Sequence, residues 1–301
     1  MNSHCIELYN INKYFDNKHV VKNLTLSIPT GKITGFLGPN GSGKTTSMRI
    51  MCGLLKPDSG SGLCFGYDIL KQRKYIKPLI GYMTQNFSLW SNLTVKENLL
   101  FLARLYDLPA PKKRVDQLID DFKIERYRNT LTSGLSGGWK QRVSLAASIL
   151  HSPKIILLDE PTAGVDPYAR REFWKILHDL SHEGMTVLVS THYMDEADRC
   201  DHLTWMSYGH LLASGTAESI IQSQGLSTFA IKGPDLTDLE FRFGDFDEIE
   251  QTVIFSSTLY ITGKNRVKIT SLLRQLPDSY QIKNVPTTLE DSFAHLMKKG
   301  M

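Results

Sequence analysis

Short apolar runs, each followed by a helical pattern, recur along the first two thirds of the chain. The runs KITGFLG (32–38), KIILLD (154–159) and MTVLVS (185–190) are rich in β-branched and other apolar residues. Continuous apolar runs of this length are typical of strands that are buried on both faces of a parallel sheet. Together with the helical patterns between them, they predict an α/β fold built on a mostly parallel sheet.

Two other patterns interrupt this alternation. The front segments CIELYNINKYF (5–15) and VVKNLTLSIP (20–29) alternate apolar and polar residues, which predicts half-exposed antiparallel strands. Strand signals are missing from about residue 90 to about residue 150, where Thr94 and Glu97 have the spacing of a capping box. We therefore predict an antiparallel β front and a helical insertion at about 90–150.

The pattern changes again after the helix-like segment TAESIIQSQ, near Gly225. The rest of the chain has four candidate strands and a closing helix with one apolar face, in the order STFAIKG, QTVIFSS, TLYITG, YQIKNV and TLEDSFAHLMKK. We therefore predict a first domain over residues 1–224 and a small α/β accessory domain over residues 225–301.

Charge and composition narrow the class of protein. The 35 basic and 31 acidic side chains leave a net charge of +4, which is too mild to indicate a nucleic-acid partner. No apolar run approaches the ~20 residues that span a bilayer, and the first residues lack the layout of a signal peptide. The four cysteines form no CxxC pair, so reduced structural thiols are expected. We expect a cytoplasmic protein.

The segment GPNGSGKTT matches the phosphate-loop pattern G-x-x-x-x-G-K-[ST] and lies between a predicted strand and a predicted helix. Its glycines let backbone N–H groups approach a phosphate, and the helix N-terminus adds partial positive charge. Lys44 is expected to reach the β- and γ-phosphates, and the Thr45 hydroxyl to ligate Mg²⁺. A glycine-rich turn that binds nothing is the alternative. The predicted nucleotide-binding residues of the loop are Gly38, Pro39, Asn40, Gly41, Ser42, Gly43, Lys44, Thr45 and Thr46.

Two carboxylates end the next apolar strand, in IILLDEPT. Asp159 is placed to hold Mg²⁺ through its water shell, because magnesium takes few protein ligands. Glu160 is predicted to orient or deprotonate the attacking water. An acidic turn without a cation is the alternative, but two adjacent buried carboxylates would repel one another.

Two further residues follow predicted strand ends. His192 comes directly after TVLVS, and ligands of open α/β sheets collect at the carboxyl ends of the strands. We therefore expect His192 to converge with Lys44 and Asp159, although a lone histidine is more often structural. Gln85 follows the short strand GYM and is predicted to sense the metal or the water. A polar turn residue is the alternative for Gln85.

The phosphate loop, Gln85, LSGGWKQR, LLDEP, AGVD and His192 occur in an order that resembles the ATP-binding subunit of ABC transporters. The resemblance covers residues 5 to about 222. The segments GVDPYARREFWKIL, STHYMDEADRC and TLEDSFAHL resemble ABC-2-type exporters, most of all multidrug export ATPases. This resemblance implies a P-loop ATPase with a separate ABC-2-type permease, on the cytoplasmic face of the inner membrane. It also implies a head-to-tail dimer with two ATP molecules at the interface.

The resemblance assigns roles to particular residues. Tyr14 matches the aromatic residue that stacks on adenine. Gln85 matches the loop that responds to the membrane partner, and Asp166 matches the inter-subunit loop. Ser136, Gly137 and Gly138 match the segment that contacts the γ-phosphate of ATP held by the other chain. Glu160 matches the catalytic carboxylate and His192 the γ-phosphate switch.

One residue departs from the family pattern, since Trp139 stands where glutamine is most frequent after the two glycines. Indole offers one donor and a large apolar face. Trp139 either stacks on the nucleotide or packs against the helical insertion, and we favour packing.

An alternative function is a soluble ABC-type ATPase that acts on ribosomes or DNA. Proteins of that class usually have paired cassettes or a long coiled-coil insertion, and neither is visible in this sequence. No concentrated basic stripe indicates a nucleic-acid surface. The favoured prediction is an ATPase, with ATP and Mg²⁺, that energises export of drugs or other hydrophobic compounds.

Overall fold

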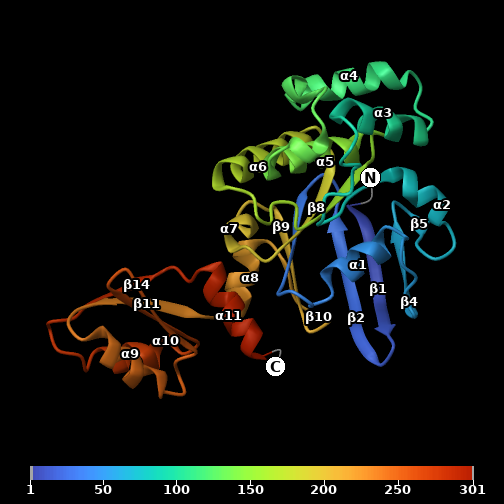
Figure 1. Ribbon diagram of the computed structural model, residues 1–301. Coiled ribbons are helices and arrows are strands. Elements are labelled where there is room, and N and C mark those ends of the chain that lie inside the picture. The colour runs from blue at the N-terminus through green and yellow to red at the C-terminus, as the bar shows by residue number, and fades with distance from the viewer. Residues whose placement is uncertain (1–2, 300–301) are drawn as a thin grey trace. The chain divides into compact units, whose positions relative to one another are not determined.

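A computed structural model describes residues 3–299 of the chain (Figure 1). The chain divides into two compact units, one up to Leu211 and one from Leu212 on. Helix α8 (Ala217–Gln224) groups with the second unit, whereas the sequence prediction ends the first domain at residue 224. Each unit has a hydrophobic core of its own.

A six-stranded sheet in the order β10-β9-β3-β8-β7-β6 forms the centre of the first unit, and its edge strand β10 extends past Leu211. Its strands are β3 (Ile33–Leu37), β6 (Ile80–Met83), β7 (Ile155–Asp159), β8 (Thr186–Thr191), β9 (His202–Ser207) and β10 (His210–Gly215). Strands β9, β3, β8, β7 and β6 run parallel, so the predicted mostly parallel sheet is confirmed. Every residue of β3, β7 and β8 is buried, which explains their continuous apolar runs.

An antiparallel sheet of four strands, in the order β2-β1-β4-β5, forms the predicted β front. Its strands are β1 (His4–Phe15), β2 (Lys18–Pro29), β4 (Ser59–Cys64) and β5 (Tyr67–Asp68). The sequence patterns did not predict β4, whose residues SGSGLC lack apolar alternation. Gly60 explains part of this composition, because a Cβ atom there would lie 2.4 Å from the carbonyl oxygen of Asn10 on β1.

Figure 1 shows the helices of the first unit arranged around its two sheets. They are α1 (Lys44–Met51), α2 (Arg73–Ile76), α3 (Val95–Leu105), α4 (Pro111–Asp121), α5 (Gly137–Ile149), α6 (Pro167–His182) and α7 (Met194–Ala197), with 3₁₀ helices η1 (Lys77–Leu79), η2 (Glu125–Tyr127) and η3 (Thr132–Gly134). Alternate residues of β7 enter two core clusters, with Ile156 and Leu158 in one and Ile155 and Leu157 in the other. The parallel sheet therefore has a hydrophobic core on each face.

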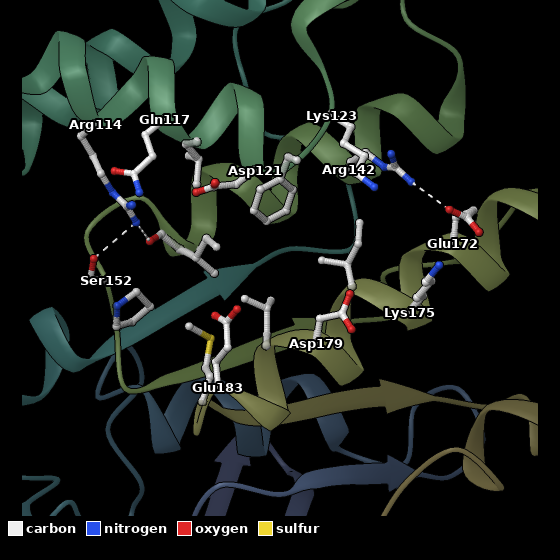
Figure 2. Close-up of a pocket in the computed structure, with 17 residues that line it drawn as sticks. Arg114, Gln117, Asp121, Lys123, Arg142, Ser152, Glu172, Lys175, Asp179 and Glu183 are labelled. Atoms are coloured by element: carbon white, nitrogen blue, oxygen red, sulfur yellow. Dashed lines mark hydrogen bonds and ion pairs between the residues drawn. The ribbon is translucent and has the colours of Figure 1, made fainter.

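The helical insertion contains α3 and α4, with no strand between β6 and β7. The predicted capping box is confirmed: the Thr94 side chain accepts from the Glu97 N–H at 3.2 Å, and Glu97 accepts from the Thr94 N–H at 2.8 Å. Arg114 of α4 donates to the carbonyl oxygen of Leu150, 3.0 Å away at the end of α5. Figure 2 shows the same guanidinium beside Ser152. Arg114 thus ties the insertion to the end of α5.

The second unit contains a four-stranded antiparallel sheet in the order β12-β13-β11-β14. In chain order its elements are β11 (Ser227–Lys232), α9 (Leu236–Gly244), β12 (Gln251–Phe255), β13 (Thr258–Gly263), α10 (Arg266–Leu273), β14 (Gln281–Val285) and α11 (Leu289–Lys299). The order from β11 to β14 is the split βαβ arrangement, with the residues of α9 and α10 in the core. All four predicted strands and the closing helix are present.

Among the helices within residues 3–299, none combines the length and the apolar character needed to cross a bilayer.

Replacing Thr94 by alanine tests the capping box. Because the substitution leaves the Glu97 N–H without its partner at the start of α3, we expect the free energy of unfolding to fall by about 1 kcal/mol. Urea unfolding of the full chain measures this change. Thr237→Ala on the exposed surface of α9 is the control, with an expected change within about 0.5 kcal/mol. Equal changes in the free energy of unfolding of the two variants would contradict a stabilising role of the Thr94 cap.

Candidate nucleotide-binding site

The loop between β3 and α1 is a compact glycine turn. Gly38, Gly41 and Gly43 have φ angles of +148°, +79° and +102°, in the region that favours glycine. A Cβ atom on Gly43 would lie 2.8 Å from the carbonyl oxygen of Val20. The loop ends at Lys44, the first residue of α1, so the unpaired N–H groups of a helix N-terminus lie at its end.

The Lys44 ammonium group is buried in this loop, with 4% of the side chain exposed. It donates to the carbonyl oxygens of Gly38 and Pro39, at 2.7 and 3.1 Å. Burial lowers its pKa below the usual range, and the nearby carboxylates of Glu160 and Asp159 oppose that shift. The nearest carboxylate oxygen, of Glu160, is 3.9 Å away. The ammonium group would also donate to a phosphate oxygen bound in this loop.

Asp159 is held by hydroxyl groups from neighbouring elements. Its Oδ1 atom accepts from the Ser190 hydroxyl at 2.7 Å and from the Thr45 hydroxyl at 3.0 Å, while Oδ2 accepts from Tyr82 at 3.4 Å. Ser190 is the partner of Asp159 in the β7–β8 register, which explains the short contact. Burial and the Asp159 carboxylate raise the pKa of Tyr82 to about 12, so Tyr82 stays a donor.

Glu160 turns away from Asp159 because its backbone adopts a left-handed conformation, with φ +46°. Its N–H donates to the Ser190 hydroxyl at 2.9 Å, which supports this turn. Its Oε2 atom accepts from Gln85 Nε2 at 3.2 Å and lies 3.6 Å from His192 Nδ1. Glu160, Gln85 and His192 therefore lie together, although their residues are far apart along the chain.

Glu160 and Gln85 border an open cavity of about 470 Å³, which His192 does not line. The side chains and loop residues that line it are Phe15, Lys18, Val20, Asn40, Gly41, Gly43, Lys44, Thr45, Thr46, Gln85 and Glu160. Phe15 lines the cavity, whereas Tyr14 stacks on His19 with ring centroids 4.0 Å apart. Sequence reasoning singled out Tyr14 and missed Phe15. It also missed Ser190 and Tyr82, which hold Asp159.

The oxygen atoms around Asp159 fit a magnesium ion. Within residues 3–299, no three His, Cys, Asp or Glu side chains gather into a metal site, and magnesium does not need such a group. The Asp159 carboxylate and the Thr45 hydroxyl supply two oxygen atoms, 3.0 Å apart. When bound, Mg²⁺ would neutralise phosphate charge beside these groups.

The segment from Ser136 to Gly138 lies elsewhere on the same unit. Ser136 and Gly137 are exposed, and Gly138 borders a cleft of about 160 Å³ that shares no lining residue with the nucleotide cavity. Asp166 lies beside this cleft and caps α6 by accepting from the N–H groups of Tyr168 and Ala169, at 3.1 and 2.9 Å. One chain therefore does not bring LSGG to its own phosphate loop.

A glycine loop whose lysine is buried beside two carboxylates, at the edge of a parallel sheet, defines a P-loop ATPase. The family model described as ABC transporter matches residues 21–163. "Nod factor export ATP-binding protein I" of Burkholderia orbicola (strain AU 1054) is 34% identical over 300 residues, which cover 98% of each chain. The chain belongs to the family of ABC transporter ATP-binding proteins, which are ATP-hydrolysing subunits.

Other relatives agree with this family. "Probable multidrug ABC transporter ATP-binding protein YbhF" of Escherichia coli (strain K12) is 41% identical over 217 residues, or 71% of this chain, and the chain spans 38% of that protein. The solved cbiO1 of Clostridium perfringens, part of the ABC transporter complex cbiONQ, has a TM-score of 0.68 at 32% identity, covering 74% of this chain and 92% of its own. A dimeric ATP-binding cassette bound to ADP and Pi has a TM-score of 0.65 at 28% identity, covering 70% and 98%. The predicted ABC ATPase fold is confirmed.

Replacing Ser190 by alanine tests how Asp159 and Glu160 are positioned. The variant loses the hydroxyl that donates to Asp159 and accepts from the Glu160 N–H, which keeps only the Ser190 carbonyl oxygen at 3.2 Å. We therefore expect ATP hydrolysis to fall about tenfold. Nucleotide affinity without Mg²⁺ should stay within about twofold. A phosphate-release assay and an equilibrium binding titration measure the two effects. Ser181→Ala, on α6, is the control, and wild-type hydrolysis in Ser190→Ala would contradict the role of Ser190.

Proposed function

We propose that the chain is the ATP-hydrolysing subunit that energises an ABC-2-type membrane exporter of drugs or other hydrophobic compounds. The observation that carries the ATPase assignment is the convergence of Lys44, Asp159, Glu160, Gln85 and His192 at one edge of the parallel sheet. The export assignment draws on the relatives, which are named for multidrug transport and for Nod factor export.

The arrangement around Glu160 suits the activation of a water molecule. In the proposed reaction the water oxygen attacks the γ-phosphorus, the bond from that phosphorus to the β–γ bridging oxygen breaks, and ADP and phosphate leave. The Glu160 carboxylate, which borders the cavity, accepts the proton of the water, and Gln85 and His192 lie beside its Oε2 atom. The buried Lys44 ammonium stabilises charge on the β- and γ-phosphates.

The exposed centre of the LSGG segment supports a head-to-tail pair of chains. Ser136 and Gly137 are exposed, and a Cβ atom on Gly137 would meet nothing within 4 Å. This open space at the start of α5 suits the γ-phosphate of an ATP that is bound in the cavity of a second copy. The dimeric cassette with ADP and Pi among the structural relatives supports such a pair.

An exposed apolar surface on the helical insertion suits a permease. Trp90 and Phe101 are 45% and 44% exposed and contact one another edge to face, with centroids 4.5 Å apart. Leu105, one turn along α3, is 68% exposed. Gln85 lies five residues before Trp90, so the same segment borders both the nucleotide cavity and this surface. We infer that the permease docks here and holds the subunit on the cytoplasmic face of the inner membrane.

Replacing Glu160 by glutamine tests the proposed base. Glutamine keeps the shape of the side chain but cannot accept the proton, so ATP affinity should be retained while hydrolysis falls by ~10²–10⁴-fold. Binding of a fluorescent ATP analogue and phosphate release measure the two properties. The exposed Glu183→Gln is the matched control and should behave as wild type. Full hydrolysis in Glu160→Gln would remove Glu160 from the role of base.

Replacing Leu105 by arginine tests the permease surface. Because Leu105 is exposed, the charge should leave ATP hydrolysis of the isolated chain unchanged within about twofold while it reduces recovery with membranes about tenfold. Fractionation of cells followed by identification of copurifying membrane proteins measures this. Val267→Arg, 79% exposed on α10, is the control. Recovery of the wild-type chain with ribosomes rather than membranes would overturn the exporter.

A further inference from the structure

The first turn of α5 has little local support. The helix starts with Gly137 and Gly138, and glycine is among the least favourable residues for a helix. Ser136 occupies the N-cap position, but its side chain makes no capping hydrogen bond. The turn that carries LSGG therefore depends on contacts with other elements for its position.

Trp139 provides these contacts on the side of the helical insertion. Its ring packs against Tyr127 of η2, with centroids 4.6 Å apart and planes tilted by 49°. The guanidinium groups of Arg126, also in η2, and Arg142, one turn along α5, lie 4.7 and 4.9 Å from the centre of the indole ring. The ring therefore joins the start of α5 to the insertion and does not line the nucleotide cavity of its own chain.

The opposite side of the same turn rests on α6. A Cβ atom on Gly138 would lie 2.7 Å from the Cβ of Ala169, so the two helices meet closely at this point. Arg142 Nη2 lies 3.9 Å from Glu172 Oε2, and Figure 2 shows the two side chains pointing toward one another from α5 and α6. Arg142 thus contacts both the Trp139 ring and Glu172 of α6. The start of α5 is held between η2 and α6.

We propose that Trp139 is a positioning residue for the shared ATP site. Its ring fixes the first turn of α5 against η2, so that Ser136 and the N–H groups near Gly137 are already placed for the γ-phosphate of ATP on a second copy. This inference rests on the proposed head-to-tail pair. Because Trp139 is absent from the cavity lining, its role is in assembly of the pair and not in the first binding of ATP.

The indole explains how the chain functions without the more frequent glutamine at this position. A glutamine side chain could bond to the nucleotide directly, but it offers no face to the two guanidinium groups. Instead of a direct contact with the nucleotide, Trp139 orders the first turn of α5 before the two chains assemble. Trp139→Gln should accordingly retain ATP hydrolysis at saturating ATP within about tenfold of wild type.

The test measures ATP-dependent dimerisation by sedimentation velocity of the full chain carrying Glu160→Gln, which prevents turnover. Adding Trp139→Ala should raise the ATP concentration at half-maximal dimerisation about tenfold, because the turn is no longer ordered before assembly. Affinity of the dilute monomer for a fluorescent ATP analogue should stay within about twofold. Trp139→Phe, which keeps an aromatic face for the arginines, should restore the midpoint to within about threefold. Phe241→Ala, removing an exposed ring of the second unit, is the control and should change nothing.

The outcomes distinguish failure of the proposed head-to-tail pair from failure of the proposed role of Trp139. A Glu160→Gln parent that does not dimerise with ATP overturns the head-to-tail pair and this inference with it. A parent that dimerises while Trp139→Ala leaves the midpoint unchanged overturns only the role of Trp139. A fall in monomer affinity as large as the shift in midpoint, in both the alanine and the phenylalanine variants, also overturns it, because the indole would then support the whole unit.

Discussion

The buried ammonium group of Lys44 is the constraint around which the nucleotide site is arranged. A cation with so little exposure is unfavourable unless charge and hydrogen bonds compensate it, and the two carbonyl oxygens of the loop do so only in part. The carboxylates that supply the remainder come from the end of β7, two strands away in the sheet. The register of β3, β8 and β7 must therefore be kept for the charge to be tolerated, which links the stability of the sheet to the state of the phosphate site.

Much of this site could be predicted because each residue follows the carboxyl end of a strand. Lys44 follows β3, Asp159 ends β7 and His192 follows β8, so the order of motifs along the chain already implied a common edge. Ser190 could not be found in this way, since its importance comes from its pairing with Asp159 across two strands. Phe15 could not be separated from Tyr14 without knowing which face of β1 borders the loop.

The elements of the fold that the sequence predicted have local signals, whereas the ones it missed depend on tertiary contacts. Strands β3, β7 and β8, with continuous apolar residues, and β1 and β2, with alternating ones, were predicted, and so was the capping box of the insertion, whereas β9 and β10 were not. Strand β4 was missed because its glycines serve a close backbone approach and not a propensity. Helix α10 was missed because RVKITSLL contains β-branched residues that favour strands. The cap by Asn265 and the packing of Ile269 and Leu273 into the core of the second unit support the helix.

The two neighbouring glycines of LSGG have different surroundings, and this difference bears on inheritance. A side chain at Gly138 would strike Ala169 within the same chain, so the substitution would disturb the packing of the chain that carries it. A side chain at Gly137 would meet only open space in its own chain. In the proposed head-to-tail pair it would obstruct the second copy instead. In a cell that makes both forms, an altered Gly137 would enter mixed pairs and spoil one site in each, so the defect would spread to normal copies as a dominant trait. An altered Gly138 would tend to be lost with its own misfolded chain and would behave as recessive.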